Sequence, residues 1–418
     1  MPILPEELNE QQSQAVEHAH GPLLVLAPVG TGKTTVIARR AAWAIRHGID
    51  PGHMLCLSFT NRAAKQIKDR VASVVPKLGN EITVRTFHGL CAHILRHDAE
   101  TLGLAPDFTI SDEEDAKDLL LRLAGCDPAS SSRDALGRVL IDFIEVQNRS
   151  ALNDDPIVDA RAVFEGVLNR RGDSVFIPVG FDPDRLAREY NQALLDQNVL
   201  DFAGLIRNVN LLLERHPDCL ARWQRLFTWI QVDEVQDTNE TEYRILSLLA
   251  RGHRNLAFFG DIDQTIYEWR DSKPFKILGL FKREFHPVRE IALTRNYRSS
   301  RGILQACETF IKKLSGSVTR RIDPDSDDPG CKIVVREEPT LHDEGDWIAT
   351  TIKEVKEAQG LRNSEIAILT RSNLTGVELS RILTKHGVSH FVIDNLRFFR
   401  RPEVKDALAL VRILVNRF

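Results

Sequence analysis

Residues 23–34 read Leu-Leu-Val-Leu-Ala-Pro-Val-Gly-Thr-Gly-Lys-Thr. A short apolar run, typical of a buried strand, leads directly into a glycine-rich loop that ends in Gly-Lys-Thr. Gly30 and Gly32 lack the Cβ atoms that would block close approach, so the backbone N–H groups of residues 29–33 can surround a phosphate. The stretch therefore predicts a phosphate-binding loop at the end of a strand.

Two side chains at the end of this loop carry the expected chemistry. Lys33 supplies a positive charge for the β- and γ-phosphates, and the Thr34 hydroxyl can bind Mg²⁺. Residues 35–45 suit a helix, and this order of strand, loop and helix favours a nucleotide site over a chance run of small residues. The loop departs from the strict pattern at Ala27, where glycine is usual. The expected nucleotide-binding loop comprises Ala27, Pro28, Val29, Gly30, Thr31, Gly32, Lys33, Thr34 and Thr35.

Composition sets wider limits. The 418 residues are enough for two or three domains, and the formal net charge of −4 means that any nucleic-acid-binding surface must be local. The six cysteines contain no CxxC pair, which favours reduced thiols in the cytoplasm. We find no run of 18 apolar residues and no signal-peptide pattern, so we expect a soluble cytoplasmic protein without a membrane partner.

One histidine-rich stretch raises the question of a metal site. His88, Cys91, His93 and His97 lie close in sequence, and the last two are four residues apart, as ligands on one helix face are. No second pair with zinc-like spacing accompanies them, and residues 89–96 are typical of a half-buried helix. We favour the helix over the metal site.

The pattern of apolar runs predicts an α/β fold with a doubly wound, mainly parallel sheet. Strands are expected at residues 23–27, 54–59, 82–84, 229–232, 256–259 and 291–293, with helices between most of them. Strand signals nearly vanish between residues 84 and 229, and residues 112–170 are charged and helix-prone, which indicates a helical insertion.

A second region follows the acidic, Pro/Gly-rich loop at residues 323–330. Strands are expected there at residues 332–336, 366–370 and 390–393, and helices at 344–358, 374–386 and 403–414. The alternation of strands and helices predicts a second α/β region.

A pair of carboxylates ends the expected strand at 229–232. Asp233 is expected to bind Mg²⁺, and Glu234 to accept the proton of an attacking water. An acidic turn after a strand is common, but together with Lys33 and Thr34 the pair predicts ATP hydrolysis.

At these residues the chain resembles a known family, the UvrD/Rep-type superfamily 1 DNA helicases. Residues 233–239, Asp-Glu-Val-Gln-Asp-Thr-Asn, resemble the family's second motif. Other segments resemble further motifs of the family in the same order: 8–16, 59–64, 86–89, 200–202, 260–270, 296–299 and 398–406. The resemblance implies a RecA-like P-loop NTPase fold and an ATP-dependent DNA helicase or translocase that moves 3′ to 5′ with single-stranded-DNA-stimulated ATP hydrolysis.

The resemblance also implies roles in the nucleotide site. It places Gln12 on the adenine edge and Tyr297 against the adenine ring. Gln264 would sense the γ-phosphate, with a plain turn residue as the alternative, and Arg298 would be an arginine finger rather than a surface arginine. Thr35 stands where many members carry arginine.

Further residues are implied to contact single-stranded DNA or a 3′-tailed duplex. Aromatic side chains suit a motor because base stacking tolerates any sequence, although Phe59 is equally well explained as core. Solvated charge is the alternative for the basic residues. The implied DNA-binding residues are Phe59, Thr60, Asn61, Arg62, Thr86, His88, Tyr267, Trp269 and Arg270.

The resemblance implies four segments. These are a first RecA-like domain in two parts (1–106 and 200–298), a helical insertion (107–199) and a partial second RecA-like domain (299–418). Nothing after residue 401 resembles the family's last two motifs, so either another polypeptide completes the motor or the chain is a shortened product. The alternative function is an ATP-dependent single-stranded-DNA-binding or regulatory module that does not unwind.

Overall fold

A parallel sheet forms the centre of the larger of two compact units. The computed structural model describes residues 8–127, 129–150, 159–171, 175–265, 273–313, 322–393 and 402–415. Six strands pair in the order β3-β2-β6-β7-β1-β8, and each pair is parallel. Their bounds are β1 Leu23–Leu26, β2 Met54–Leu57, β3 Thr83–Arg85, β6 Trp229–Val232, β7 Leu256–Gly260 and β8 Arg289–Ala292. The predicted α/β fold class is confirmed, because each of these strands overlaps an expected one.

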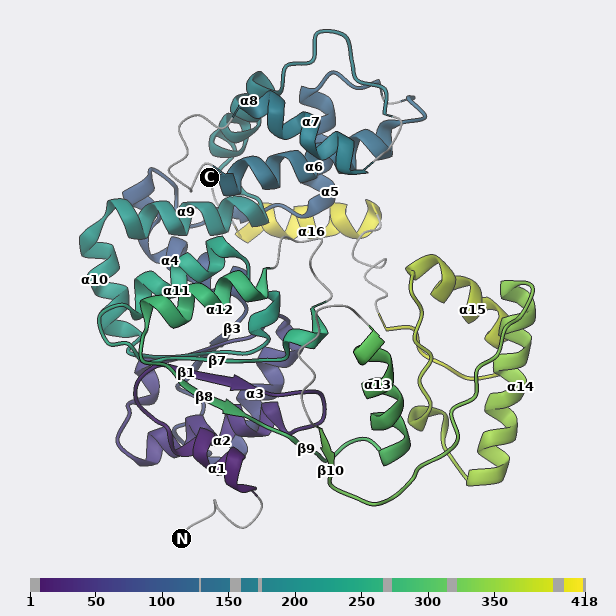
Figure 1. Ribbon diagram of the computed structural model, residues 1–418. Helices are drawn as coiled ribbons and strands as arrows, with labels where there is room; N and C mark the ends of the chain where they lie inside the picture. The colour runs from purple at the N-terminus through teal and green to yellow at the C-terminus, as the bar shows by residue number, and fades with distance from the viewer. Residues whose placement is uncertain are drawn as a thin grey trace. The chain divides into compact units, whose positions relative to one another are not determined.

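Helices cover both faces of this sheet (Figure 1). One face packs against α1 (Glu10–Glu17), α2 (Lys33–Arg46) and α3 (Asn61–Val74). The other packs against α4 (Phe87–Asp98), α9 (Phe202–Arg215), α10 (Pro217–Leu226), α11 (Glu240–Ala250) and α12 (Pro274–Glu284). The central strands are therefore buried on both sides, which explains why they consist of continuous apolar runs.

Polar residues start the helices at the sheet's edge. The Asn9 side chain accepts the N–H of Gln12 and begins α1, Thr60 caps α3, and Thr86 caps α4 in the same way. Each cap satisfies a backbone donor that the first turn leaves without a partner, which is worth about 1 kcal/mol. Thr60 and Thr86 follow β2 and β3, so their caps place the starts of α3 and α4 at the carboxyl edge of the sheet.

The expected helical insertion has a hydrophobic core of its own. It comprises α5 (Glu113–Leu123), α6 (Arg133–Ser150), α7 (Ala160–Arg171) and α8 (Pro183–Asp196), whose buried side chains form one cluster. Two short parallel strands, β4 (Thr109–Ile110) and β5 (Val199–Leu200), pair with each other. The first directly precedes α5 and the second directly follows α8, so they lie where the chain enters and leaves the insertion. The four segment boundaries expected from the sequence stay a prediction.

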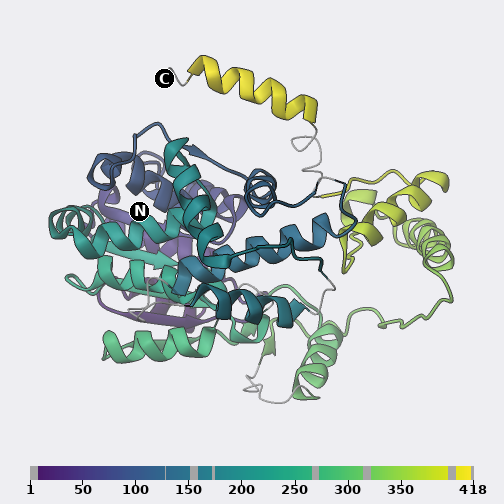
Figure 2. The ribbon, with the colours of Figure 1, turned by 90° about the horizontal axis from the view of Figure 1, so that it is seen from above.

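The chain divides into two compact units, residues 1–330 and 331–418. The first also contains β9 (Arg295–Asn296), α13 (Arg301–Lys313) and β10 (Asp323–Pro324), and β9 pairs with β10. The second contains α14 (Leu341–Gln359), α15 (Asn373–Lys385) and α16 (Pro402–Val415). In this unit α14 and α15 lie side by side (Figure 1, Figure 2) around a small core that includes Ala349 and Leu383.

Three strands expected in the second unit are wrong. Residues 332–336, 366–370 and 390–393 form no strand within the described residues 322–393. An apolar segment becomes a strand only when a neighbour pairs with its backbone. Val335 and Leu369 are 91% and 95% exposed, so their hydrophobicity finds no sheet to pack on. The helices expected in this unit are confirmed with small shifts of their ends.

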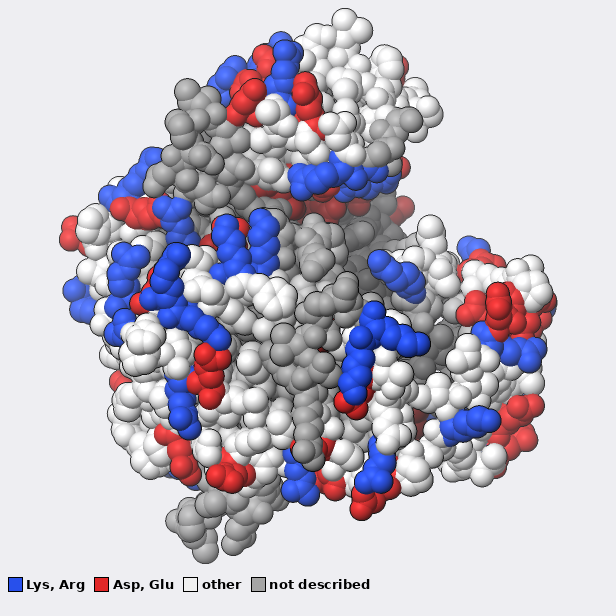
Figure 3. Space-filling model, in the orientation of Figure 1, with Lys and Arg blue, Asp and Glu red and all other residues white. Residues whose placement is uncertain are grey.

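Acidic and basic side chains are mixed on the face that Figure 3 shows, as the small net charge leads us to expect. Among the described residues, no helix is both long and apolar enough to cross a membrane.

Candidate nucleotide-binding site

The glycine-rich loop joins β1 to α2 at the carboxyl edge of the sheet. Gly30 and Gly32 have φ angles of +77° and +84°, in the left-handed region that favours glycine. A Cβ on Gly30 would lie 2.5 Å from Asn296 Nδ2, and one on Gly32 would lie 2.8 Å from Gln12 Nε2. Both glycines are therefore required by backbone conformation and by space.

Ala27 shows why the loop tolerates a residue other than glycine at its first position. Its φ angle is not positive, its side chain is 1% exposed, and its N–H donates to the Gly260 carbonyl at 2.8 Å. Position 27 thus continues the sheet rather than the loop. Within the loop, the Thr31 hydroxyl donates to the Pro28 carbonyl at 2.7 Å, and Val29 is 41% exposed.

Three charged side chains meet beside the loop. Lys33 begins α2, which follows β1 and the loop. Asp233 and Glu234 follow β6, which β7 separates from β1 in the sheet. Lys33 Nζ forms an ion pair with Glu234 Oε2 and lies 3.4 Å from Asp233 Oδ1. The structure therefore brings together the lysine and both carboxylates that the sequence singled out.

Burial and charge act on these groups in opposite directions. Burial lowers the pKa of Lys33, but attraction to Asp233 and Glu234 outweighs it, so the lysine pKa is raised. Burial raises the pKa of Asp233 to about 6, although attraction to Lys33 opposes this shift. The Lys33 ammonium group alone does not offset the cost of burying the charged Asp233 carboxylate. A second cation nearby would stabilise the ionised form of Asp233.

The donor set fits a hydrated Mg²⁺ ion. Carboxylate and hydroxyl oxygens are the hard ligands that Mg²⁺ prefers, and the ion keeps several waters. Asp233 is 6% exposed and Thr34 follows Lys33 at the start of α2. These two residues would hold the ion.

The segment after β8 returns to lie on the phosphate-binding loop. Tyr297 N–H donates to the Gly30 carbonyl at 2.9 Å, and Asn296 Nδ2 donates to the Val29 carbonyl at 2.5 Å. Asn296 Oδ1 accepts the N–H groups of Arg298 and Ser299. Arg298, which is exposed, is thereby fixed beside Gly30.

Asn296 is a site residue that our sequence analysis assigned no role. It stands inside a quoted motif, but only its burial, at 2% exposed, and its contacts to two separate backbone segments show its importance. A signal was present in the sequence, since an asparagine side chain often accepts the N–H groups of residues two or three positions later.

Gln12 lies under the loop rather than in open space. Its Nε2 donates to the Thr31 carbonyl at 2.9 Å, and its Oε1 accepts the Asn9 N–H at 3.1 Å. An amide has two donor hydrogens and two acceptor lone pairs, so each end keeps one further valence for a base edge.

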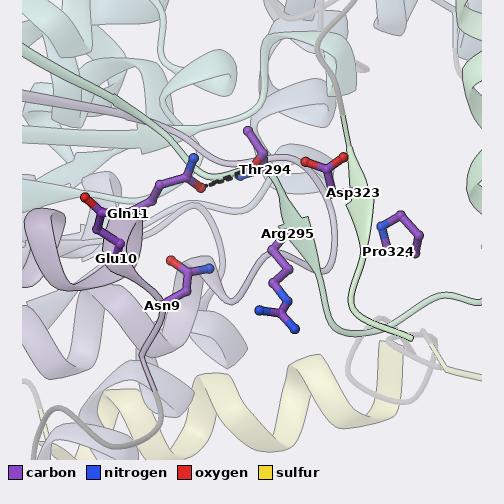
Figure 4. A pocket seen from close by; sticks show the side chains of 7 residues that line it. All are labelled: Asn9, Glu10, Gln11, Thr294, Arg295, Asp323 and Pro324. Atoms are coloured by element: carbon purple, nitrogen blue, oxygen red, sulfur yellow. Dashed lines mark hydrogen bonds between the residues drawn. The ribbon is translucent and has the colours of Figure 1, made fainter. Parts of the chain in front are cut away.

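A pocket of about 400 Å³ lies next to α1 (Figure 4). Figure 4 shows the Gln11 side chain directed toward Thr294, and its Oε1 accepts the Thr294 N–H at 3.0 Å. Beside the pocket, the Tyr297 hydroxyl accepts a hydrogen bond from Asn9 Nδ2 at 2.8 Å, and its side chain is 43% exposed. The residues that line the pocket are Asn9, Glu10, Gln11, Thr294, Arg295, Asp323 and Pro324.

Two other residues that we expected to contact the nucleotide form hydrogen bonds with protein side chains. Gln264 follows β7, and its Nε2 donates to Asp261 Oδ2 at 2.7 Å. The Thr35 hydroxyl accepts from Arg70 of α3 at 3.1 Å. An arginine from the neighbouring helix α3 thus contacts Thr35.

The expected DNA-binding residues that the structure describes follow two adjacent strands, β2 and β3. Phe59 is half-buried and therefore neither core nor fully exposed, while Asn61 and Arg62 are exposed at the start of α3. Thr60 and Thr86 serve as helix caps, through their bonds to the N–H groups of Ala63 and Gly89. Tyr267, Trp269 and Arg270 lie outside the described residues.

The histidine-rich stretch forms helix α4. The His93 and His97 rings both lie 5.6 Å from the Trp223 ring, edge to face, and His88 contacts the Phe202 ring in the same way at 5.3 Å. Burial raises the pKa of the Cys91 thiol. These side chains thus serve packing between α4 and its neighbours, and no group of metal ligands is found among the described residues.

A parallel doubly wound sheet with a glycine-rich loop, a lysine and two carboxylates at its carboxyl edge defines a P-loop nucleotide-binding protein. Two family models match the chain: the UvrD/REP helicase N-terminal domain over residues 8–286 and the UvrD-like helicase C-terminal domain over residues 291–418. The chain belongs to the UvrD/Rep helicase family.

Curated relatives agree with this assignment. The ATP-dependent DNA helicase PcrA of Staphylococcus epidermidis is 32% identical over 422 residues, which cover 100% of this chain and 55% of the relative. PcrA of Bacillus subtilis is 33% identical, covering 98% and 53%, and PcrA of Leuconostoc citreum is 31% identical with the same coverage. The chain spans about half the length of the curated relatives it matches.

Proposed function

We propose that this chain binds ATP and Mg²⁺ and hydrolyses ATP at the phosphate-binding loop. One observation carries the proposal: Lys33, Asp233 and Glu234 meet beside the loop, and the segment that holds Arg298 is hydrogen-bonded to the same loop. The names of the relatives, ATP-dependent DNA helicases, support it.

Each residue has a role in this proposal. Lys33 would exchange its ion pair with Glu234 for one with the phosphates. Thr34 and Asp233 would hold Mg²⁺, which would neutralise charge on the phosphates. Glu234, released from the lysine, accepts the proton of a water. Arg298 donates hydrogen bonds to the transferred phosphoryl group. Gln264 breaks its hydrogen bond to Asp261 and binds the γ-phosphate, so that its position depends on whether this phosphate is present.

The adenine base is proposed to lie beside Gln12 and Tyr297. The remaining valences of the Gln12 amide and the exposed Tyr297 ring support this position.

We further propose that hydrolysis drives 3′-to-5′ movement along single-stranded DNA. The residues that follow β2 and β3 supply a path at the same edge of the sheet as the nucleotide site, because both strands are parallel to β6 and β1. Phe59 and Trp269 would stack on bases.

The alternative, a nucleotide-dependent DNA-binding module without unwinding, is favoured by one observation. Residues 332–336, 366–370 and 390–393, expected to build a second sheet, form no strand in the described part of that unit. A motor needs two rigid domains that close on ATP. The expected second polypeptide stays a prediction.

Strand displacement on tailed duplexes separates the two functions. In the presence of ATP, we expect the wild-type protein to unwind a duplex with a 3′ single-stranded tail and not one with a 5′ tail. We expect the Lys33→Ala variant to unwind neither. Tight ATP-dependent binding to the 3′ tail without displacement would instead support the binding module.

A further inference from the structure

Gln236 lies between the two strands that carry the proposed catalytic groups. It belongs to a single 3-10 turn, Val235–Asp237, directly after Glu234, and is 3% exposed. Its Nε2 donates to Glu234 Oε2 at 2.8 Å, and its Oε1 accepts the N–H of Asp261 at 3.1 Å. One amide therefore connects the end of β6 to the end of β7.

The Gln236 amide packs directly against Gly260. A Cβ on Gly260 would overlap Gln236 Oε1 and would lie 2.8 Å from Val235 Cγ1. Gly260 has no positive φ, so glycine is needed here for space and not for backbone conformation. The absence of a side chain at position 260 keeps the amide in place.

The backbone at Glu234 also depends on this support. Glu234 has a φ of +54°, in the left-handed region that non-glycine residues rarely adopt. Such a conformation persists when surrounding contacts fix it. The Gln236 amide supplies one of these contacts, since it binds the Glu234 carboxylate from the following turn.

The chain of hydrogen bonds continues beyond Gln236. Asp261, 4% exposed, accepts Gln264 Nε2 at 2.7 Å through its carboxylate, while its own N–H goes to Gln236. Glu234, Gln236, Asp261 and Gln264 thus form one continuous series across the neighbouring strands β6 and β7.

We propose that Gln236 is a positioning residue that holds the Glu234 carboxylate in place and couples it to the strand end that bears Gln264. The proposal rests on the proposed ATP hydrolysis. The glutamine amide serves both contacts, because the Glu234 carboxylate requires a donor and the Asp261 N–H requires an acceptor. Lys33 shares Glu234 Oε2 with Gln236, so the amide contact remains when the lysine turns to the phosphates.

Kinetics of the Gln236→Met variant test this role, since methionine keeps the volume and loses both hydrogen bonds. We expect kcat for ATP at saturating DNA to fall about ten- to hundredfold, the size expected for a lost hydrogen bond to a charged group, with KM for ATP within about twofold. The matched control is Gln224→Met, because Gln224 donates to the Leu248 carbonyl from α10, which precedes the amino end of β6, whereas the site follows the carboxyl end of that strand. An unchanged kcat, a change in KM alone, or an equal loss in the control would overturn the proposal.

A second measurement needs no activity. Gly260→Ala pushes on the Gln236 amide, so we expect its loss of Tm to be smaller in a Gln236→Ala background, where the amide is gone. If the Tm losses of Gly260→Ala and Gln236→Ala are strictly additive, the contact between position 260 and the Gln236 amide is contradicted. If the wild type hydrolyses no ATP, the proposed function fails while this cycle still decides whether Gln236 holds its place.

Discussion

The Glu234→Gln substitution separates nucleotide binding from hydrolysis. In the structure Glu234 forms an ion pair with Lys33, the residue proposed to bind the phosphates. Nucleotide must therefore break this pair when it binds. The glutamine variant lacks the competing charge and the proposed base, so we expect tighter ATP binding together with loss of hydrolysis.

The structure sets the size of the affinity change. Two unit charges 4 Å apart attract by about 4 kcal/mol at an effective dielectric constant of 20. The Glu234 side chain is 33% exposed, and Lys33 keeps Asp233 at 3.4 Å in either protein. Solvent screening and this second carboxylate reduce the difference to about 1–2 kcal/mol, which corresponds to a roughly 5- to 30-fold lower Kd for ATP.

Calorimetric titration of ATP in the presence of Mg²⁺ measures this Kd, with phosphate release followed on the same samples. Glu290→Gln is the matched control, because Glu290 pairs with Lys282 on the surface, away from the loop. Unchanged or weaker ATP binding by Glu234→Gln would refute the competition between carboxylate and phosphate. Surviving hydrolysis would refute the assignment of the base.

Three further predictions concern other parts of the site. Trp269→Ala should weaken single-stranded DNA binding by about 1–3 kcal/mol in fluorescence anisotropy with little change in ATP affinity, and unchanged DNA affinity would return Trp269 to the core. Asn296→Asp keeps the acceptor for the Arg298 N–H but loses the donor to the Val29 carbonyl, so kcat should fall about tenfold or more, whereas wild-type turnover would show that this link is dispensable. Because the folded-state pKa of Asp233 is raised to about 6, its ionisation costs stability that is fully felt above that pH. Asp233→Asn should therefore raise Tm more at pH 7.5 than at pH 5, and an equal effect at both pH values would contradict the shift.

The central sheet was predictable because local and tertiary signals agree there. Strands such as Trp229–Val232 are buried on both faces, so their apolar runs are continuous, and the glycine-rich loop between β1 and α2 has a specific pattern. The same reasoning failed at residues 332–336, where the apolar run is present but no neighbouring strand pairs with it. Apolar character predicts burial, whereas a strand also needs a partner that sequence does not reveal.

The site was predictable as a set of reactive groups and not as a network. Lys33, Asp233 and Glu234 have chemistry that a motif identifies, and the structure brings them together. Asn296 and Gln236 act through backbone N–H and carbonyl groups of segments remote in sequence, so their importance depends on tertiary geometry. The Lys33–Glu234 ion pair was likewise not expected, because from the sequence we assigned Lys33 to the phosphates and Glu234 to a water.

Steady-state phosphate release with and without single-stranded DNA tests the central claim most directly, with Lys33→Ala measured beside the wild type. We predict turnover that DNA stimulates and that the variant lacks. ATP binding without turnover in a well-folded wild-type sample, at any DNA concentration, would contradict the proposal that Lys33, Asp233, Glu234 and Arg298 form a working hydrolytic site.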